Sequence, residues 1–158
     1  SGFTGQDNFF DNTSNEFFLT GVQLEVGQNA TSFEHRSFGE EILKCQRYYC
    51  KSYGYGTVPG TSASGSAVYN RFSDTVSNRT DLGTRFPVTM RTTPDITPYS
   101  LTGTVDKVSD CSTGTSHSAN IGVSSVLNKG QNGFGGFQVS TSFDHLAGYH
   151  YEADAEFA

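Results

Sequence analysis

The sequence contains few charged residues, and acidic residues outnumber basic ones. Asp, Glu, Lys and Arg make up 16% of the 158 residues, against about 25% in an average globular domain. The balance between 16 carboxylates and ten Lys and Arg gives a formal net charge of −6. A protein that binds nucleic acid needs a basic face to displace counterions from the phosphates. The charge balance therefore argues against a nucleic-acid partner.

Cysteine and long apolar runs are also scarce. Cys45, Cys50 and Cys111 form an odd and sparse set, so we expect free thiols, as in a protein made in a reducing cytosol. Zinc usually needs about four ligands at characteristic spacing, and the four histidines are scattered, so we expect no metal and no cofactor. No apolar run approaches the roughly 20 residues that span a membrane, which predicts no membrane insertion. The chain begins Ser1-Gly2 without Met, which suggests a fragment or a tag remnant.

Hydroxyl-bearing, glycine and aromatic residues are abundant instead. The chain has 19 Ser, 18 Thr, 18 Gly, 13 Phe and 8 Tyr, a composition typical of β-structure. Short segments with alternating or β-branched residues are separated by turns rich in Gly, Ser, Asn and Thr. This pattern predicts a mainly β fold, an antiparallel sandwich or barrel, of which we expect the β-sandwich. The expected strands are 67–72, 83–90, 95–100, 103–108, 119–127, 134–141 and 150–157.

Two elements are expected before this β region. Residues 17–26 alternate as a strand once Gly21 is allowed as a bulge, and residues 31–38 form an extended connector. Ser37 and Glu40 have the spacing of a capping box, which predicts one short helix over 39–51. Gly54 and Gly56 follow it as stop signals.

Few residues form a pattern that indicates catalysis. Glu40 and Glu41 have a structural explanation at a helix start, and Glu152, Asp154 and Glu156 have one as the solvent-facing side of the last strand. The abundance of Ser makes any Ser/His/Asp match uninformative, and no nucleophile elbow, zincin or P-loop motif is present. We therefore expect no catalytic residue, although paired carboxylates leave a glycoside hydrolase as an alternative.

Aromatic rings in polar, glycine-rich surroundings indicate sugar recognition. A flat ring can cover the apolar face of a pyranose while neighbouring polar groups pair with its hydroxyls; the other reading is that such rings are core or interface residues. Tyr53 and Tyr55 lie in one such segment. The second is the long loop 128–137, in which we predict receptor contacts by Gln131, Asn132, Phe134 and Phe137, since long loops on rigid scaffolds tend to carry function.

Several motifs resemble the C-terminal region of bacteriophage tail-fibre proteins and related prophage virion proteins. The most specific are LTGVQLEVG at 19–27, ATSFEHRSFGEE at 30–41 and CQRYY at 45–49. FPVTMR at 86–91 followed by Thr93-Pro94, the stretch from Tyr99 to Gly103, and ADAE at 153–156 resemble further segments. The intervals 57–82 and 109–135 depart from the family pattern, and in fibre tips such variable intervals are usually the binding loops.

The resemblance implies a homotrimeric fibre tip in the virion, synthesised in the host cytoplasm, which binds a bacterial capsule or lipopolysaccharide without cleaving it. It implies that residues 1–36 are a remnant strand and connector from a missing lectin-like jelly roll, 37–56 a helix and linker, and 57–158 the fibre-tip sandwich. In a trimer, Ile42, Cys45 and Tyr49 would meet their copies. A capsule-degrading depolymerase and a purely structural trimerisation or decoration domain remain alternatives.

Overall fold

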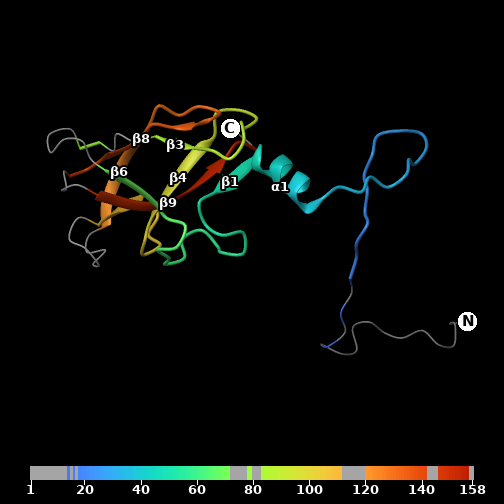
Figure 1. The fold of residues 1–158 in the computed structure, drawn as a ribbon, viewed down its shortest axis with the longest axis horizontal. Helices are drawn as coiled ribbons and strands as arrows, with labels where there is room; N and C mark the ends of the chain where they lie inside the picture. Colours follow the sequence, from blue (N-terminus) through green and yellow to red (C-terminus); the bar gives the residue numbers. More distant parts are fainter. Residues whose placement is uncertain are drawn as a thin grey trace, which may run out of the picture. The chain divides into compact units, whose positions relative to one another are not determined.

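The structure is a computed structural model, and it describes residues 14, 16, 18–71, 78–79, 83–111, 120–141 and 146–156. Two compact units divide the chain, Ser1–Arg36 and Ser37–Ala158. The second unit holds every helix and strand of the described residues, and its ribbon is shown in Figure 1.

The expected strand at 17–26 is wrong for residues 18–26, the described part of that range. These residues form no strand, and Leu24 is 99% exposed. A strand needs a neighbour to receive its backbone hydrogen bonds, and the described residues offer none here. Gly21 also has φ of +70°, which interrupts an extended backbone.

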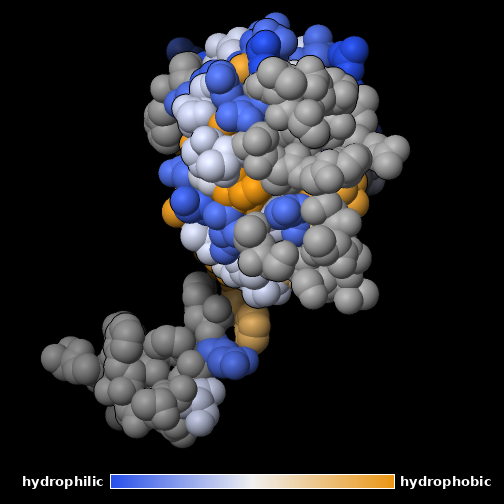
Figure 2. Space-filling model, turned by 90° about the vertical axis from the view of Figure 1, so that its left-hand side faces the viewer, coloured by the Kyte–Doolittle hydropathy of each residue, from blue (hydrophilic) through white to orange (hydrophobic). Residues whose placement is uncertain are grey.

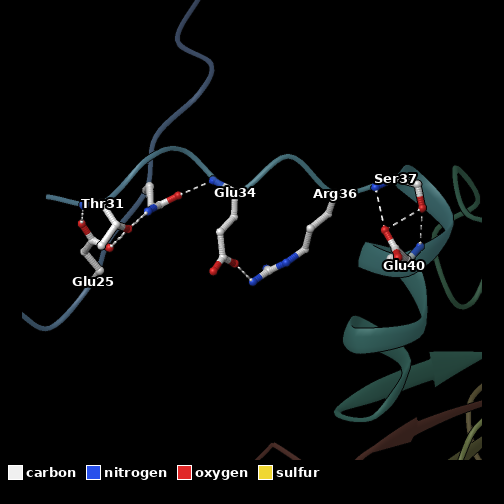
Figure 3. A network of polar contacts seen from close by, with 7 residues as sticks. Glu25, Thr31, Glu34, Arg36, Ser37 and Glu40 are labelled. Atoms are coloured by element: carbon white, nitrogen blue, oxygen red, sulfur yellow. Dashed lines mark hydrogen bonds and ion pairs between the residues drawn. The ribbon is translucent and has the colours of Figure 1, made fainter.

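Polar contacts order the connector that follows (Figure 3). The backbone N–H and the hydroxyl of Thr31 both donate to the carboxylate of Glu25, each at 2.6 Å. The Thr31 hydroxyl, then its backbone N–H, hold the pKa of Glu25 below its ordinary value. The backbone N–H of Glu34 donates to the side chain of Gln23 at 2.9 Å, and Arg36 pairs with Glu34.

The helix α1, Phe38–Gln46, has the capping box that its sequence predicts. The Glu40 N–H donates to Ser37 Oγ at 3.3 Å, and the Ser37 N–H donates to Glu40 Oε2 at 2.9 Å, as Figure 3 shows. The helix ends five residues before the predicted residue 51, because Tyr49–Lys51 forms strand β1 and pairs with β9. No side chain of α1 is buried.

Strand β9, Leu146–Asp154, is the centre of a seven-stranded sheet in which all pairs are antiparallel. One edge of β9 pairs with β2 and β1, and the other with β5 and β4. The sheet continues from β5 through β6 to β8, and β3 and β7 form a separate two-stranded sheet. The remaining strands are β2 Val68–Arg71, β3 Thr84–Arg85, β4 Asp95–Ser100, β5 Lys107–Asp110, β6 Asn120–Leu127, β7 Gly133–Phe134 and β8 Gly136–Val139.

For the residues that the structure describes, the mainly β fold with antiparallel sheets and one short helix is confirmed, whereas the sandwich and the trimer stay predictions. Strand 95–100 has the predicted bounds. The predicted strand 103–108 overlaps β5 only at its end, because Gly103 and Asp106 have positive φ and turn the chain there. Of 83–90, only Thr84–Arg85 forms a ladder.

The core lies on one face of β9. Tyr149, Tyr151 and Ala153 alternate along the strand and are buried, and they pack with residues of the other strands. Side chains of this cluster include Phe86, Met90, Val108, Phe134, Phe137 and Val139. Figure 2 shows a mixed outer surface, with hydrophilic residues around a small apolar area.

The opposite face of β9 carries Glu152 and Asp154, which were predicted to face solvent, and also His150, which is fully buried. The ring of Tyr53 stacks on the imidazole with 3.9 Å between centroids. The Nε2–H of His150 donates to the carbonyl of Ala63 at 3.1 Å, so Nδ1 accepts from the Ser52 hydroxyl at 2.9 Å. Burial lowers the pKa of His150, which favours this neutral form.

Candidate binding site

The predicted receptor loop is a short, rigid ribbon. Gly130 and Gly133 exchange backbone hydrogen bonds at 2.9 and 3.3 Å, which leaves only Gln131 and Asn132 in the turn. The prediction that this loop is too long for a tight hairpin is therefore wrong. The segment folds into a two-residue turn, as in the common tight β-hairpins.

A second segment fixes this ribbon along its length. Thr84 and Arg85 pair with Phe134 and Gly133 in an antiparallel ladder. The N–H groups of Phe86 and Met90 donate to the carbonyls of Asn132 and Gln131, at 3.0 and 2.9 Å. We call residues 83–91 and 128–135 together the platform. Because backbone bonds join its two segments, side chains on it are held by a rigid frame.

Glycine at position 133 is required by this pairing. Its φ is +151°, and a Cβ there would lie 2.1 Å from the carbonyl oxygen of Thr84. Real Cβ atoms do not approach an oxygen so closely, so any other residue would push the two strands apart. The glycine serves the close approach of two backbones, rather than the approach of a ligand.

The aromatic rings of the loop are not exposed, and this part of the prediction is wrong. Phe134 is 3% exposed and Phe137 is fully buried. The ring centroid of Phe134 lies 5.2 Å from that of Phe137 and 5.4 Å from that of Tyr151. The pairing of Thr84 with Phe134 turns both side chains toward the core, where Thr84 bonds the hydroxyl of Tyr149 at 2.7 Å.

The second predicted aromatic segment is split between core and surface. Tyr53 is buried against His150, contrary to the prediction, whereas Tyr55 is 68% exposed as predicted. The stacked imidazole and the N–H of Gly60, which donates to the Tyr53 hydroxyl at 3.3 Å, hold Tyr53, and Tyr55 lies beyond them in a turn.

Gln131 and Asn132 are exposed, as the prediction of receptor contacts requires. Their side chains also tie the platform together. Gln131 Nε2 donates to the carbonyl of Arg91 at 3.0 Å, and the Thr89 hydroxyl donates to Asn132 Oδ1 at 2.7 Å. The amide nitrogen of Asn132 keeps its donors for solvent or a ligand.

A hollow of about 390 Å³ opens beside the platform. Two of its polar residues, Arg85 and Asn128, are exposed, and neither forms a side-chain hydrogen bond within the described part of the chain. Asn128 has φ of +49°, a conformation that Asn tolerates better than most residues. The hollow is lined by Gly83, Thr84, Arg85, Asn128, Gly133, Phe134 and Gly135.

Exposure alternates along the first segment of the platform. Phe86 and Met90 are buried, and Arg85, Thr89 and Arg91 are exposed together with Pro87. We call Arg85, Pro87, Thr89 and Arg91 the exposed row of this segment, in which only Thr84–Arg85 is a strand. A second hollow, of about 420 Å³, is lined by Val88 and Thr89 together with Leu43, Lys44 and Arg47 of α1.

The three predicted trimer contacts lie at or just after α1 and are not buried. Ile42 is partly exposed, and Cys45 is exposed. Tyr49 is partly exposed, and its hydroxyl donates to Glu152 at 2.9 Å. No partner chain tests their role, which stays a prediction.

Glu152 is held as an acceptor by two tyrosines that the sequence did not connect to it. The hydroxyl of Tyr99 donates to Oε1 at 2.6 Å and that of Tyr49 to Oε2 at 2.9 Å. Burial, followed by the bond to Glu152, raises the pKa of Tyr49 and Tyr99. Both tyrosines therefore stay protonated and donate at ordinary pH.

The described residues hold no group of three His, Cys, Asp or Glu that could bind a metal ion. None of their helices is long and apolar enough to cross a membrane. Arg85 and Asn128 were not among the predicted site residues. The available signal was the complete lack of Asp and Glu in residues 83–91 and 128–135, but the pairing of these segments was needed to use it.

No protein-family model, curated protein or solved structure matches this chain.

Proposed function

We propose that this chain is the receptor-binding tip of a bacteriophage tail fibre, which binds a polysaccharide of the host surface during adsorption. The virion role rests on the resemblance of residues 17–49 and of the shorter motifs to tail-fibre proteins. In this proposal the protein works as a homotrimer in the distal fibre and binds the capsule or lipopolysaccharide without cleaving it.

The observation that carries the binding role is the hollow of about 390 Å³ beside a rigid ribbon. Small-ligand sites are concave, with a few placed polar groups, and occupy roughly 300–1,000 Å³. Arg85 and Asn128 offer donors and an acceptor at the hollow, and Asn132 offers a further amide on the same platform. Sugar hydroxyls need such donors and acceptors, and the fixed backbone lowers the entropy cost of binding.

The exposed helix supports the trimer. Phe38 is 75% exposed, and no residue of α1 is buried. A short helix gains most of its stability by packing an apolar face against a neighbouring element. The described residues provide no neighbour that buries a side chain of this helix. We propose that Ile42 and Cys45 of α1, together with Tyr49 at the start of β1, meet the other two copies.

An adsorption experiment tests the proposal. The fluorescently labelled chain is incubated with a panel of bacterial strains, and purified capsule and lipopolysaccharide from each bound strain are added as competitors. We expect binding to some strains, competition by one purified polysaccharide, and no release of reducing sugar. If the protein binds none of the strains, the receptor role is wrong. If reducing sugar is released, the protein is a depolymerase.

Light scattering tests the assembly separately. The monomer mass is 17.1 kDa, so a trimer has about three times this mass. We expect the trimer at micromolar concentration, and expect Ile42→Asp, which places a charge on the proposed contact, to give the monomer mass. Leu43→Asp, about 100° around the helix from Ile42, is the matched control and should keep the trimer mass. A monomer mass for the unmodified chain overturns the trimer.

A further inference from the structure

Positive charge is concentrated on the platform of this acidic protein. Residues 83–91 and 128–135 contain Arg85, Arg91 and Lys129 and no Asp or Glu, whereas the whole chain has 16 carboxylates and a net charge of −6. The two segments are 37 residues apart in the sequence and are brought together by the β3–β7 ladder. The fold therefore builds a local cationic surface that the overall charge does not suggest.

Two of the three cations already have partners in the protein. Lys129 Nζ lies 3.1 Å from a carboxylate oxygen of Asp95. The guanidinium of Arg91 donates to the carbonyls of Ala155 and Glu156, at 3.4 and 2.9 Å, and lies over the ring of Tyr48. Arg85 has no such partner among the described residues.

Arg85 also lies where a ligand can reach it. Its side chain is exposed, and it lines the hollow of about 390 Å³ together with Asn128. Its neighbour in the ladder is Gly133, so no side chain stands opposite it across the ribbon. An exposed guanidinium beside a hollow can form a bidentate pair of hydrogen bonds with a carboxylate.

We propose that the platform selects an acidic glycan, and that Arg85 binds a carboxylate of one of its sugars. The proposal rests on the proposed function and names the class of its receptor. Asn128 bonds a hydroxyl of the same sugar, because its amide offers both donors and an acceptor. The negative net charge of the chain repels an acidic polymer elsewhere, which confines binding to the platform.

The exposed row extends this contact toward α1. Thr89, four residues after Arg85, lines the second hollow together with Lys44 and Arg47. Four residues of extended chain span at most about 14 Å, so a polymer lying along the row reaches both hollows. We therefore expect Lys44 and Arg47 to add affinity for long chains and not for short oligomers.

Binding to defined polymers tests the proposal. The probes are polygalacturonate, the same polymer with its carboxyls reduced to alcohols, and dextran sulfate. Affinity is measured with the full chain and with Arg85→Gln, Arg85→Lys and Lys107→Gln. Lys107→Gln removes the same charge from strand β5, and thermal melting confirms that each variant is folded.

We expect polygalacturonate to bind and the reduced polymer not to bind. Arg85→Gln should weaken binding about tenfold or more, the scale of a charge-assisted hydrogen bond, and Arg85→Lys should lose less. Lys107→Gln should change affinity less than twofold. Equal losses for Arg85→Gln and Lys107→Gln, or dextran sulfate binding as tightly as polygalacturonate, would show general attraction of charge and overturn the proposal.

A last comparison separates this inference from the proposed function. Capsule from a strain that the protein adsorbs to is treated to reduce its carboxyls, and the competition is repeated. If the reduced capsule competes as well as the native one, the acidic-glycan inference is wrong while the receptor role stands. If polygalacturonate binds through Arg85 but the protein adsorbs to no strain, the receptor role is wrong and the site stands.

Discussion

Replacing Phe134 with alanine tests whether this ring stabilises the core or binds a ligand. The ring is 3% exposed, and four other rings lie around it: Phe86, Phe137, Tyr149 and Tyr151, with centroids between 5.2 and 6.5 Å away. Truncating a buried Phe to Ala costs about 3–5 kcal/mol, because transfer energy is lost and a cavity remains. The unfolding free energy of a whole domain is only about 5–15 kcal/mol, so losing this ring removes a large share of the stability.

Urea unfolding followed by near-ultraviolet circular dichroism of the tyrosines measures this change. We expect the Phe134→Ala variant to lose about 3–5 kcal/mol of unfolding free energy, with an unchanged slope against urea. Tyr55→Ala is the matched control, since its ring is 68% exposed, and it should change stability by less than about 0.5 kcal/mol. A Phe134→Ala loss below about 1 kcal/mol would contradict the buried position of the ring.

Three further predictions follow from buried groups. Gly133→Ala should destabilise the platform strongly, since a Cβ there lies 2.1 Å from the Thr84 carbonyl oxygen; Gly65→Ala, where a Cβ meets nothing within 4 Å, should be nearly neutral in the same urea assay. His150 has a folded pKa below its ordinary value of 6.5, so the unfolded chain binds the proton first. Stability should therefore fall as pH drops below 6.5, and His150→Gln should remove this part of the pH dependence. The three cysteines are free, with Cys45 exposed and the other two buried, and burial raises the pKa of Cys50 to about 11. A thiol reagent should therefore label Cys45 alone in the folded protein. A reductant should leave the melting temperature unchanged.

Local rules were sufficient where neighbouring residues decide the structure. The capping box of Ser37 and Glu40 needs only four consecutive residues, and it forms as predicted. The alternation of Tyr149, Tyr151 and Ala153 likewise identifies the buried face of β9 without knowledge of its neighbours. Both patterns depend on the period of a helix or a strand, which the sequence contains directly.

Tertiary pairing decided the features that the sequence did not predict. The helical pattern continues past Gln46, but the chain gains backbone bonds by pairing Tyr49–Lys51 with β9, so the helix ends. His150 alternates with the buried tyrosines and lies on the same face of β9 as Glu152, but the segment containing Ser52, Tyr53 and Ala63 covers it. Neither partner segment can be identified from the alternation of β9 alone.

The candidate site shows the same dependence on pairing. A glycine-rich loop that contains Phe134 is consistent with an exposed ring on a flexible loop, and also with a tight ribbon whose ring enters the core. The choice is made by residues 83–91, far away in the sequence, whose backbone receives the ribbon and turns Phe134 inward. The same pairing leaves Arg85 outward, opposite the hydrogen at Gly133. The ring predicted to bind sugar therefore supports the frame, and the guanidinium on the partner strand becomes the group that can recognise a ligand.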